Sequence, residues 1–146
     1  MTMHRRPVGR SRRLVAIGAL VALVGCFLPW FTRGGVDGLP PYTGTAFESM
    51  GILVFAAAIA TLALVTLPYA SERPVSADRW PSYALIAALG WFGFAYRILE
   101  LAGIQAFSFA QPADIVTRIP GLWLCAIGLA IMARATYEML QEPRLR

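Results

Sequence analysis

Groups that carry polar chemistry are scarce in this sequence. The only histidine is His4, there is no lysine, and the two cysteines stand far apart at Cys26 and Cys125. Zinc sites and histidine-dependent hydrolases need histidines or closely spaced cysteines, and the sequence has no glycine-rich phosphate-binding motif. We therefore expect a protein that is not an enzyme and that holds neither a metal nor another cofactor.

Charged residues are also few, and the apolar residues stand in long runs. Of 146 residues, 14% are charged and 58% are hydrophobic. A helix of roughly 20 apolar residues crosses a hydrocarbon core, and four blocks qualify, at about 14–31, 46–70, 81–103 and 119–137. The pattern predicts an all-α membrane protein, a four-transmembrane-helix bundle that occupies 14–140 as one domain.

Arginines indicate how the spans are oriented. All 13 basic residues are arginines, and five of them lie in the tail at 1–13. Arg73 and Arg79 lie between the second and third spans, and further arginines follow the fourth. Positive residues stay on the cytoplasmic side, so both tails, 1–13 and 141–146, are predicted to be cytoplasmic (N-in/C-in). Arginine without lysine, with alanine-rich helices, is typical of GC-rich bacteria, so we expect a multi-pass protein of the inner (plasma) membrane.

The connections between the spans contain signals of helix ends. The first external loop, 32–44, is short and rich in glycine and proline, which leaves no room for a long regular element. Thr45 and Glu48 form a Thr-x-x-Glu capping box, which predicts that the second helix begins before its apolar run. Gly103 suits the left-handed residue that closes a helix. The segment 104–110 predicts a short strand paired with the first loop.

A motif at the end of the first span resembles a known group of proteins. Residues Phe27–Phe31 read Phe-Leu-Pro-Trp-Phe and are followed by Gly34-Gly35 and a glycine-rich loop. This arrangement resembles small four-helix bacterial inner-membrane proteins of unknown function, which have a Leu-Pro-Trp exit after the first helix. The resemblance covers about the first 70 residues. It implies a four-helix membrane fold and assigns no active residues.

Arg97 and Glu100 are the only charges placed well inside a predicted span. By steps of three and four, they share one side of the third helix with Tyr83, Ile86, Gly90 and Gly93. Glycines on that side would admit a neighbouring helix closely. Two interpretations follow, which are an interfacial ion pair that stabilises assembly and a substrate or ion site.

Small residues recur at helical spacing in all four spans, where they let helix backbones approach closely within a bilayer. The predicted packing positions are Gly18, Ala22 and Gly25 in the first span, Ala56, Ala60 and Ala63 in the second, Gly90 and Gly93 in the third, and Gly121, Cys125 and Gly128 in the fourth. These faces serve either to build the bundle or to contact another protein.

The cysteines allow three interpretations. The segment Leu23-Val24-Gly25-Cys26 resembles a lipobox, whose cysteine receives lipid after the preceding segment is cleaved. Cys26 and Cys125 also lie at matching depths near the outer ends of their spans, so a disulfide requires only that the first and fourth helices are neighbours. In the third interpretation, they are separate packing residues.

The outer face offers four carboxylates, which are Asp37, Glu48, Glu100 and Asp114. We interpret them as solvated or arginine-paired loop charges. The leading prediction is a non-catalytic integral membrane protein that acts by association, as a homo-oligomer or as an accessory subunit of an envelope complex. The alternative is a small transporter or channel that uses Arg97 and Glu100. The lipid bilayer is an expected partner and nucleic acid is not, because no aromatic residue is interleaved with the tail arginines.

Overall fold

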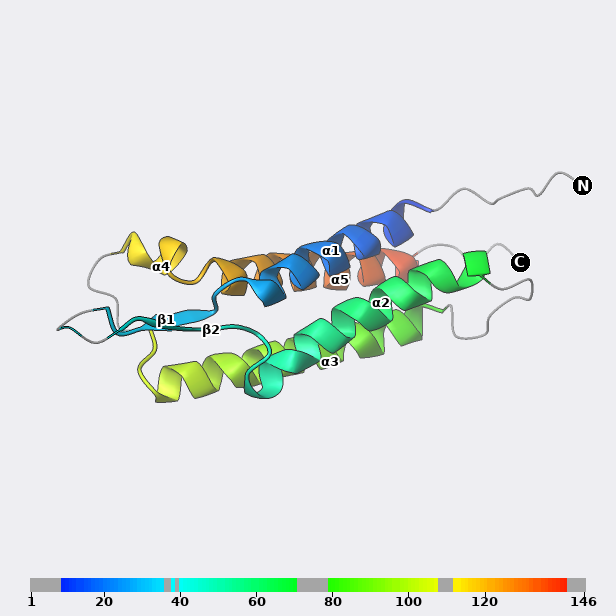
Figure 1. Cartoon of the computed structure of the whole chain (residues 1–146). Coiled ribbons are helices and arrows are strands. Elements are labelled where there is room, and N and C mark those ends of the chain that lie inside the picture. The colour runs from blue at the N-terminus through cyan, green and yellow to red at the C-terminus, as the bar shows by residue number, and fades with distance from the viewer. Residues whose placement is uncertain (1–8, 36–37, 39, 71–78, 108–111, 142–146) are drawn as a thin grey trace, which may run out of the picture.

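The computed structural model describes residues 9–35, 38, 40–70, 79–107 and 112–141 of the chain. The long helices of this part are α1 (Arg10–Phe27), α2 (Ile52–Ala70), α3 (Trp80–Gly103) and α5 (Pro120–Gln141). They run side by side, and the chain reverses direction from each to the next (Figure 1). A two-stranded sheet and the short helix α4 (Asp114–Thr117) lie at one end of the bundle, which we call the hairpin end. α1 begins and α5 ends at the opposite end.

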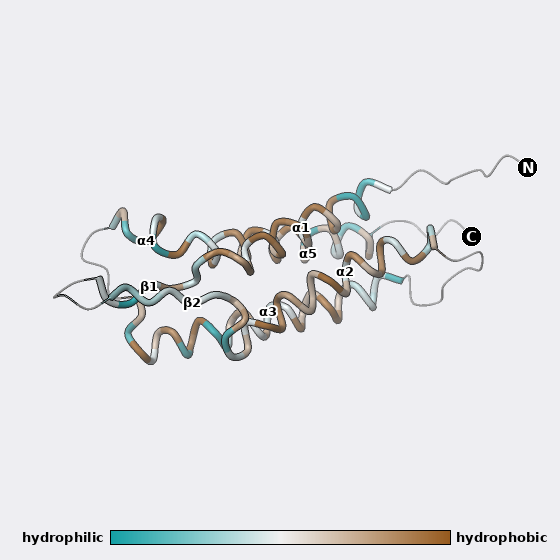
Figure 2. The backbone as a smooth tube through the Cα atoms, viewed as in Figure 1, coloured by the Kyte–Doolittle hydropathy of each residue, from teal (hydrophilic) through white to brown (hydrophobic). Residues whose placement is uncertain are grey.

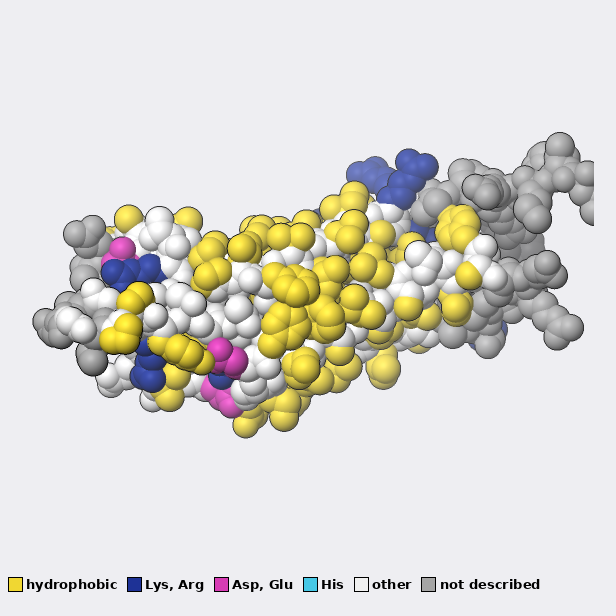
Figure 3. Space-filling model, in the orientation of Figure 1, with side chains coloured by type: hydrophobic (Ala, Val, Ile, Leu, Met, Phe, Trp, Pro, Cys, Tyr) yellow, Lys and Arg dark blue, Asp and Glu magenta, His cyan; other side chains and the backbone are white. Residues whose placement is uncertain are grey.

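Hydrophobic residues predominate along the long helices (Figure 2). Hydrophobic side chains cover the middle of the molecule, and charged side chains are visible at the hairpin end and over the start of α1 (Figure 3). Three helical segments are long and apolar enough to cross a membrane, namely Ser49–Ala70, Trp80–Gly103 and Pro120–Gln141. α1 has 18 residues, of which three of the first four are arginines, so its apolar part is shorter. The chain is thus mainly helical and has the character of a multi-pass membrane protein, in which helices satisfy their own backbone hydrogen bonds.

The four long helices pack in a ring. α1 contacts α5 and α2, and α3 contacts α2 and α5. The largest wholly buried side chains include Trp30, Leu101, Leu129 and Met132. These side chains come from α3 and α5 and from the tryptophan that follows α1.

The first helix ends at Phe27 and not at 31, where the apolar run ends. Pro29 is the physical reason, because the residue before a proline is kept out of the helical region, and Leu28 is extended, with ψ of 160°. Trp30 turns back beneath the helix end. Its side chain is wholly buried, and its Nε1 donates a hydrogen bond to the carbonyl oxygen of Gly25 at 3.1 Å.

The first loop pairs with itself. β1 (Phe31–Arg33) and β2 (Tyr42–Gly44) form an antiparallel hairpin. The prediction that 104–110 supplies a strand to this loop is wrong for 104–107, which form a turn, while 108–110 lie outside the described residues. Self-pairing is possible because glycines such as Gly34, with φ of 79°, let the chain reverse over a short distance.

The end of α3 is closed by a residue other than glycine. Gly103 is the residue that the sequence predicts to be left-handed, because glycine adopts this conformation easily. Gln105 adopts it instead, with φ of 55°. The amide of Ala106 donates to the carbonyl oxygen of Leu101 at 2.9 Å, a hydrogen bond of the Schellman motif. Leu101 and Ala106 are both buried in the core, so apolar packing determines where this helix ends.

α2 begins later than the capping box predicts. A single 3-10 turn, η1 (Ser49–Gly51), comes first, and α2 starts at Ile52. Glu48 makes no side-chain capping hydrogen bond, and its carboxylate lies 3.2 Å from Arg97 instead. The predicted capping box is wrong because a carboxylate gains more from a buried guanidinium than from a neutral backbone amide. The helical segment as a whole still begins just before the apolar run, at Ser49.

α5 is longer than its apolar run. It begins at Pro120, whose fixed φ suits a first helical position, and it continues past 137 to Gln141. Arg134 and Glu138 form an ion pair at 3.3 Å with i,i+4 spacing. This pair supports a further turn of helix beyond the apolar residues.

Candidate functional site

A cluster of ion pairs surrounds Arg97 near the hairpin end of the bundle. Arg97 lies in α3 and is 7% exposed. Its Nη1 donates to Glu100 Oε2 at 3.1 Å, and its Nη2 donates to Glu48 Oε2 at 3.2 Å. One guanidinium therefore holds two carboxylates from different parts of the chain. Such charge-assisted hydrogen bonds are strong where water is largely excluded.

Three elements position these groups. Glu100 follows Arg97 by three residues, so both face the same side of α3. Glu48 belongs to the loop between β2 and η1. This loop follows the hairpin and lies against α3. Phe31 of β1 is buried, and its ring centroid lies 5.5 Å from Arg97 Cζ, a cation–π contact. The hairpin thereby closes over the guanidinium.

Two hydroxyl groups complete the cluster. Tyr42 donates to Glu48 Oε1 at 3.0 Å, and Ser49 donates to Glu100 Oε1 at 2.7 Å. Ser49 has φ of 56°, which is uncommon for a residue other than glycine, so its hydrogen bond offsets a local strain. The hydrogen bond to Glu48, and secondly the negative charge of Glu48, raise the pKa of Tyr42, because ionisation would break the bond and bring two negative charges together.

The chemistry of this cluster is electrostatic. One positive and two negative side chains leave a formal charge of −1. Among the described residues, no group of three or more His, Cys, Asp or Glu side chains is able to hold a metal ion. Arg97 Nε is buried and has no hydrogen-bond partner in that part of the chain. The arrangement can fasten the hairpin to α3, and it leaves one N–H donor for an additional acceptor.

The sequence predicts the pairing of Arg97 with Glu100 but not the part played by Glu48, which lies 49 positions from Arg97. One signal was present, because a buried arginine needs compensating charge and Glu48 immediately precedes a neighbouring apolar run. Asp114 belongs elsewhere, since it pairs with Arg118 at 3.6 Å. Asp37 lies outside the described residues.

Glycines bring α1 and α5 into close contact. A Cβ atom added to Gly25 would lie 2.7 Å from the amide nitrogen of Cys125, and one added to Gly18 would lie 2.8 Å from the carbonyl oxygen of Gly128. Gly121 and Ala22 are buried in the same interface. Because these neighbours are backbone atoms that cannot move aside, the observed contact requires glycine.

Glycines of α3 make room for two neighbours. A Cβ atom added to Gly90 would lie 2.8 Å from Leu129 Cδ2 of α5, and one added to Gly93 would lie 2.5 Å from Leu53 Cβ of α2. Both glycines are on the side of α3 that carries Arg97, which is buried as well. The side predicted from the three- and four-residue steps therefore faces the interior of the bundle.

The predicted alanine face of α2 does not pack inside the bundle. Ala56 and Ala63 are exposed and Ala60 is half-buried. The buried residues of α2 are Val54, Ala57, Ala58 and Thr61. The helix is rotated in this way because Ala57, and not the predicted alanines, lies against Gly90 of α3. We call Ala56, Ala60 and Ala63 the outer alanines.

Cys26 and Cys125 are neighbours inside the bundle. Their Sγ atoms are 3.8 Å apart, and both thiols are free and wholly buried. Cys125 also donates to the carbonyl oxygen of Ala22 at 3.3 Å. The helix adjacency that a disulfide requires is present, while the two sulfurs are in contact without a bond. A lipid on Cys26 would have to displace Cys125, so this burial favours the packing interpretation over lipidation.

Comparison of the chain with models of protein families, with curated proteins and with solved structures found no match. The resemblance of residues 27–35 to small four-helix inner-membrane proteins stays a prediction. Function is therefore inferred from the geometry.

Proposed function

We propose that this chain is a four-span protein of a bacterial inner membrane, with both ends in the cytoplasm, that works without catalysis by associating with a second copy or with another membrane protein of an envelope complex. The three apolar helices and the alignment of α1 beside them support four spans. α1 begins where α5 ends (Figure 1), which supports placing both ends on one side. The arginines of α1 then favour the cytoplasmic side.

The observation that carries this proposal is the position of the outer alanines. Ala56, Ala60 and Ala63 follow steps of four and three along α2 and face away from the bundle. Small residues in a bilayer permit close approach of another helix and the van der Waals packing that drives association. Phe27, Phe47 and Phe55 form a separate aromatic group within the chain, with centroid distances of 5.1 to 6.1 Å. The outer alanines therefore offer an outward surface on which another helix can pack.

The state of the interior supports association over transport. The polar or charged residues buried within the described part are Ser11, Thr61, Arg97 and Thr136. Arg97 is bound by two carboxylates of its own chain, and the Thr136 hydroxyl donates a hydrogen bond to the carbonyl oxygen of Met132. Arg97 and Thr136 are thus engaged in internal contacts, whereas Thr61 Oγ1 is buried without a hydrogen-bond partner among the described residues. These few buried polar groups offer little to line a path for a polar solute.

A substitution on α2 tests the association. Ala60→Trp should abolish the dimer or the co-purifying partner, whereas Leu85→Trp is the matched control because Leu85 is 73% exposed on α3. Size exclusion with light scattering in mild detergent, combined with reciprocal pull-down, measures the outcome. A wild-type protein that is strictly monomeric and retains no partner would contradict the proposal.

One observation favours transport as a second candidate. Arg97 Nε is buried without a partner among the described residues, and a transported anion could accept its hydrogen bond. Proteoliposome flux with wild-type protein and Arg97→Lys would test this. Flux that is lost in a variant of wild-type stability would support transport over association.

A further inference from the structure

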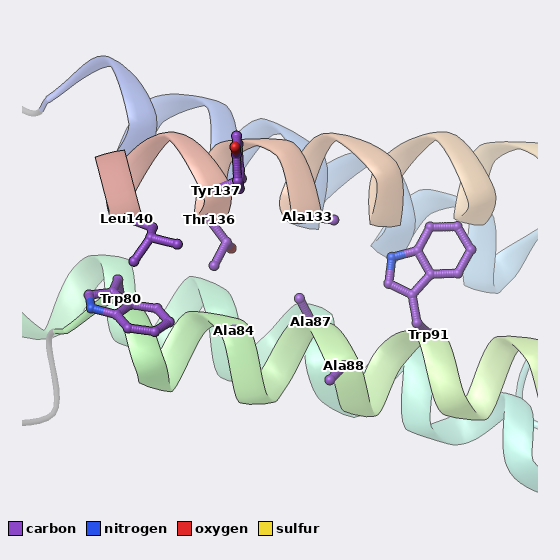
Figure 4. A pocket seen from close by; sticks show the side chains of 9 residues that line it. All are labelled: Trp80, Ala84, Ala87, Ala88, Trp91, Ala133, Thr136, Tyr137 and Leu140. Atoms are coloured by element: carbon purple, nitrogen blue, oxygen red, sulfur yellow. The ribbon is translucent and has the colours of Figure 1, made fainter. Parts of the chain in front are cut away.

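A cavity of about 280 Å³ lies between α3 and α5 (Figure 4). Trp80 and Trp91 stand at its two ends, and alanines of both helices line the space between them. Trp91 is held in place by an edge-on contact with Phe94, with ring centroids 5.8 Å apart. The cavity is therefore an elongated groove between two tryptophans, which we call the α3–α5 groove.

The groove exists because the side chains that line it between the two helices are small. Ala84, Ala87 and Ala133 leave space that larger side chains would fill. The contrast is the α1–α5 interface, where glycines bring the backbones together. Thr136 lines the groove, but its hydroxyl donates to the carbonyl oxygen of Met132 at 2.8 Å. The lining is thus apolar and suits hydrocarbon better than water or a polar solute.

The shape and position of the groove fit an acyl chain. Trp80 and Trp91 are eleven residues apart in α3, which at ~1.5 Å per residue makes the groove about 16 Å long. It opens sideways from the bundle, where Tyr137 and Leu140 are exposed. An apolar groove that faces a bilayer is surrounded by lipid tails, and leaving it empty would forfeit the dispersion contacts of its walls.

Charge at one mouth of the groove selects the lipid headgroup. Arg79 is exposed and immediately precedes Trp80 at the start of α3. A helix start carries partial positive charge, which adds to the attraction for an anion. Among the acidic residues that the structure describes, Glu138 is the one on the last turns of α5, and it is bound to Arg134 at 3.3 Å. Asp78 precedes Arg79 in the sequence and lies outside the described residues. The charges that the structure describes at this mouth favour an anionic headgroup over a zwitterionic one.

We propose that the α3–α5 groove binds one acyl chain of an anionic phospholipid whose phosphate is contacted by Arg79. In the proposed orientation this lipid belongs to the inner leaflet. The site goes beyond the association through the outer alanines, and it rests on the proposed function only for the membrane location and the orientation. The lipid fills a gap between two helices and thereby supports the ring of the bundle.

Lipid retention measures the proposal directly. The full chain is reconstituted in nanodiscs that contain equal parts of phosphatidylglycerol and phosphatidylcholine, extracted in mild detergent, and analysed by native mass spectrometry. Wild-type protein should retain one phosphatidylglycerol per chain, with a preference of about fivefold over phosphatidylcholine for the single arginine. Arg79→Gln should bring this preference close to one, whereas Arg10→Gln, at the start of α1, should leave it unchanged.

Filling the groove tests the acyl chain separately. Ala84→Leu and Ala133→Leu should each reduce retention of both lipids several-fold, and Ala63→Leu on the outer face of α2 should not. Arg79→Gln is a surface change, so its outcome stands even if a filled variant folds poorly. Equal retention by a filled variant of wild-type stability, or no preference for the anionic lipid in wild-type protein, would overturn the proposal.

A contact between copies is the competing occupant. Ala88→Cys in a Cys26→Ser, Cys125→Ser background should give no disulfide-linked dimer on mild oxidation, because lipid covers the groove. A dimer formed through residue 88 would overturn the lipid assignment. Loss of association in Ala60→Trp with lipid retention intact, or the reverse, separates the failure of one proposal from the failure of the other.

Discussion

Glu48 and Arg97 are 49 residues apart in the chain and form an ion pair of 3.2 Å. The pair joins the loop after the hairpin to α3, and Glu100 binds the other side of the same guanidinium at 3.1 Å. Removal of Arg97 would therefore leave two carboxylates facing each other. Removal of one glutamate would leave the arginine with a partner.

Arg97→Ala should destabilise the folded chain more than Glu48→Gln. Breaking a buried pair costs about 3–5 kcal/mol, and we expect about 2 kcal/mol here because the two carboxylates are 37% and 33% exposed. Glu48→Gln should cost about 1 kcal/mol, since its amide still accepts a hydrogen bond. Thermal unfolding in detergent measures both. Equal stability of Arg97→Ala and wild-type protein would refute the structural part assigned to the cluster.

Exchanging Arg97 with Glu100 should not restore stability. In the double variant Arg97→Glu, Glu100→Arg, the new glutamate at 97 would face Glu48, which adds repulsion between like charges. A third change, Glu48→Gln, should recover part of the loss by removing that repulsion. Recovery in the double variant alone would show that Glu48 contributes little. The amount of folded protein in the membrane and its unfolding temperature are the measurements.

The hydrogen bond from Tyr42 to Glu48 should make stability depend on alkaline pH. The pKa of Tyr42 is raised above the ordinary value of 10.0 in the folded chain. A group with a raised folded pKa contributes stability that is fully present below its unfolded pKa and is lost as pH rises through the folded pKa. Unfolding temperature should thus fall as pH rises above 10.0 and through the raised pKa of Tyr42. The unfolding temperature of Tyr42→Phe should fall less over the same pH range. An identical decline in the variant and the wild-type protein would contradict the assignment.

Gly121→Ala should disrupt the bundle because the added Cβ would lie 2.5 Å from the carbonyl oxygen of Leu28 and 2.6 Å from that of Gly25. These are backbone atoms, so α1 and α5 would have to separate, at a cost of about 1–3 kcal/mol. Gly103→Ala is the matched control, since nothing lies within 4 Å of its added Cβ. Chemical denaturation in detergent compares the two. A loss of equal size at both positions would contradict the contact as its cause, because helix propensity alone favours alanine over glycine at both.

The two cysteines should be reduced and close enough to be joined. Alkylation under denaturing conditions without prior reduction should modify both Cys26 and Cys125, which are free thiols 3.8 Å apart. In a separate sample that has not been alkylated, treatment of the folded chain with a membrane-permeable oxidant should form the disulfide and lower the mass by two hydrogens. Intact mass also tests lipidation, because loss of the first 25 residues with added acyl chains would make Cys26 a lipid anchor. Failure to crosslink would contradict the adjacency of α1 and α5.

Reporter fusions test the proposed topology. Fusions within 71–78 and after Glu142 should report the cytoplasm, and fusions at Gly35 and Gln111 should report the outside. The arginine distribution is the reason, since the N-terminal tail, the 71–80 connection and the C-terminal end from Arg134 onward together hold ten of the 13 arginines, whereas the two external connections hold only Arg33 and Arg118. An external fusion after Glu142 would mean that α1 does not cross the membrane or that the chain has another orientation.

Much of the helical architecture was predictable because it depends on local composition. Uninterrupted apolar runs led to α2, α3 and α5, and the end of α2 at Ala70 and of α3 at Gly103 coincide with the ends of those runs. Pro29 was a readable signal that α1 ends early, since the restriction on Leu28 is local. The side of α3 that carries Gly90 and Arg97 followed from helical periodicity.

Only the tertiary structure decided which residues meet. Local patterns made Glu48 a capping residue and allowed the outer alanines to be a face inside the bundle. Neither is the case, because the residues that decide lie far away in sequence: Arg97 offers Glu48 a buried charge, and Ala57 fits against Gly90. The end of α3 at Gln105 likewise depends on where Ala106 packs. Composition and periodicity are properties of consecutive residues, so they determine the class of protein and the positions of its helices. Which residues contact each other depends on their distance in space, and local sequence patterns do not specify that distance.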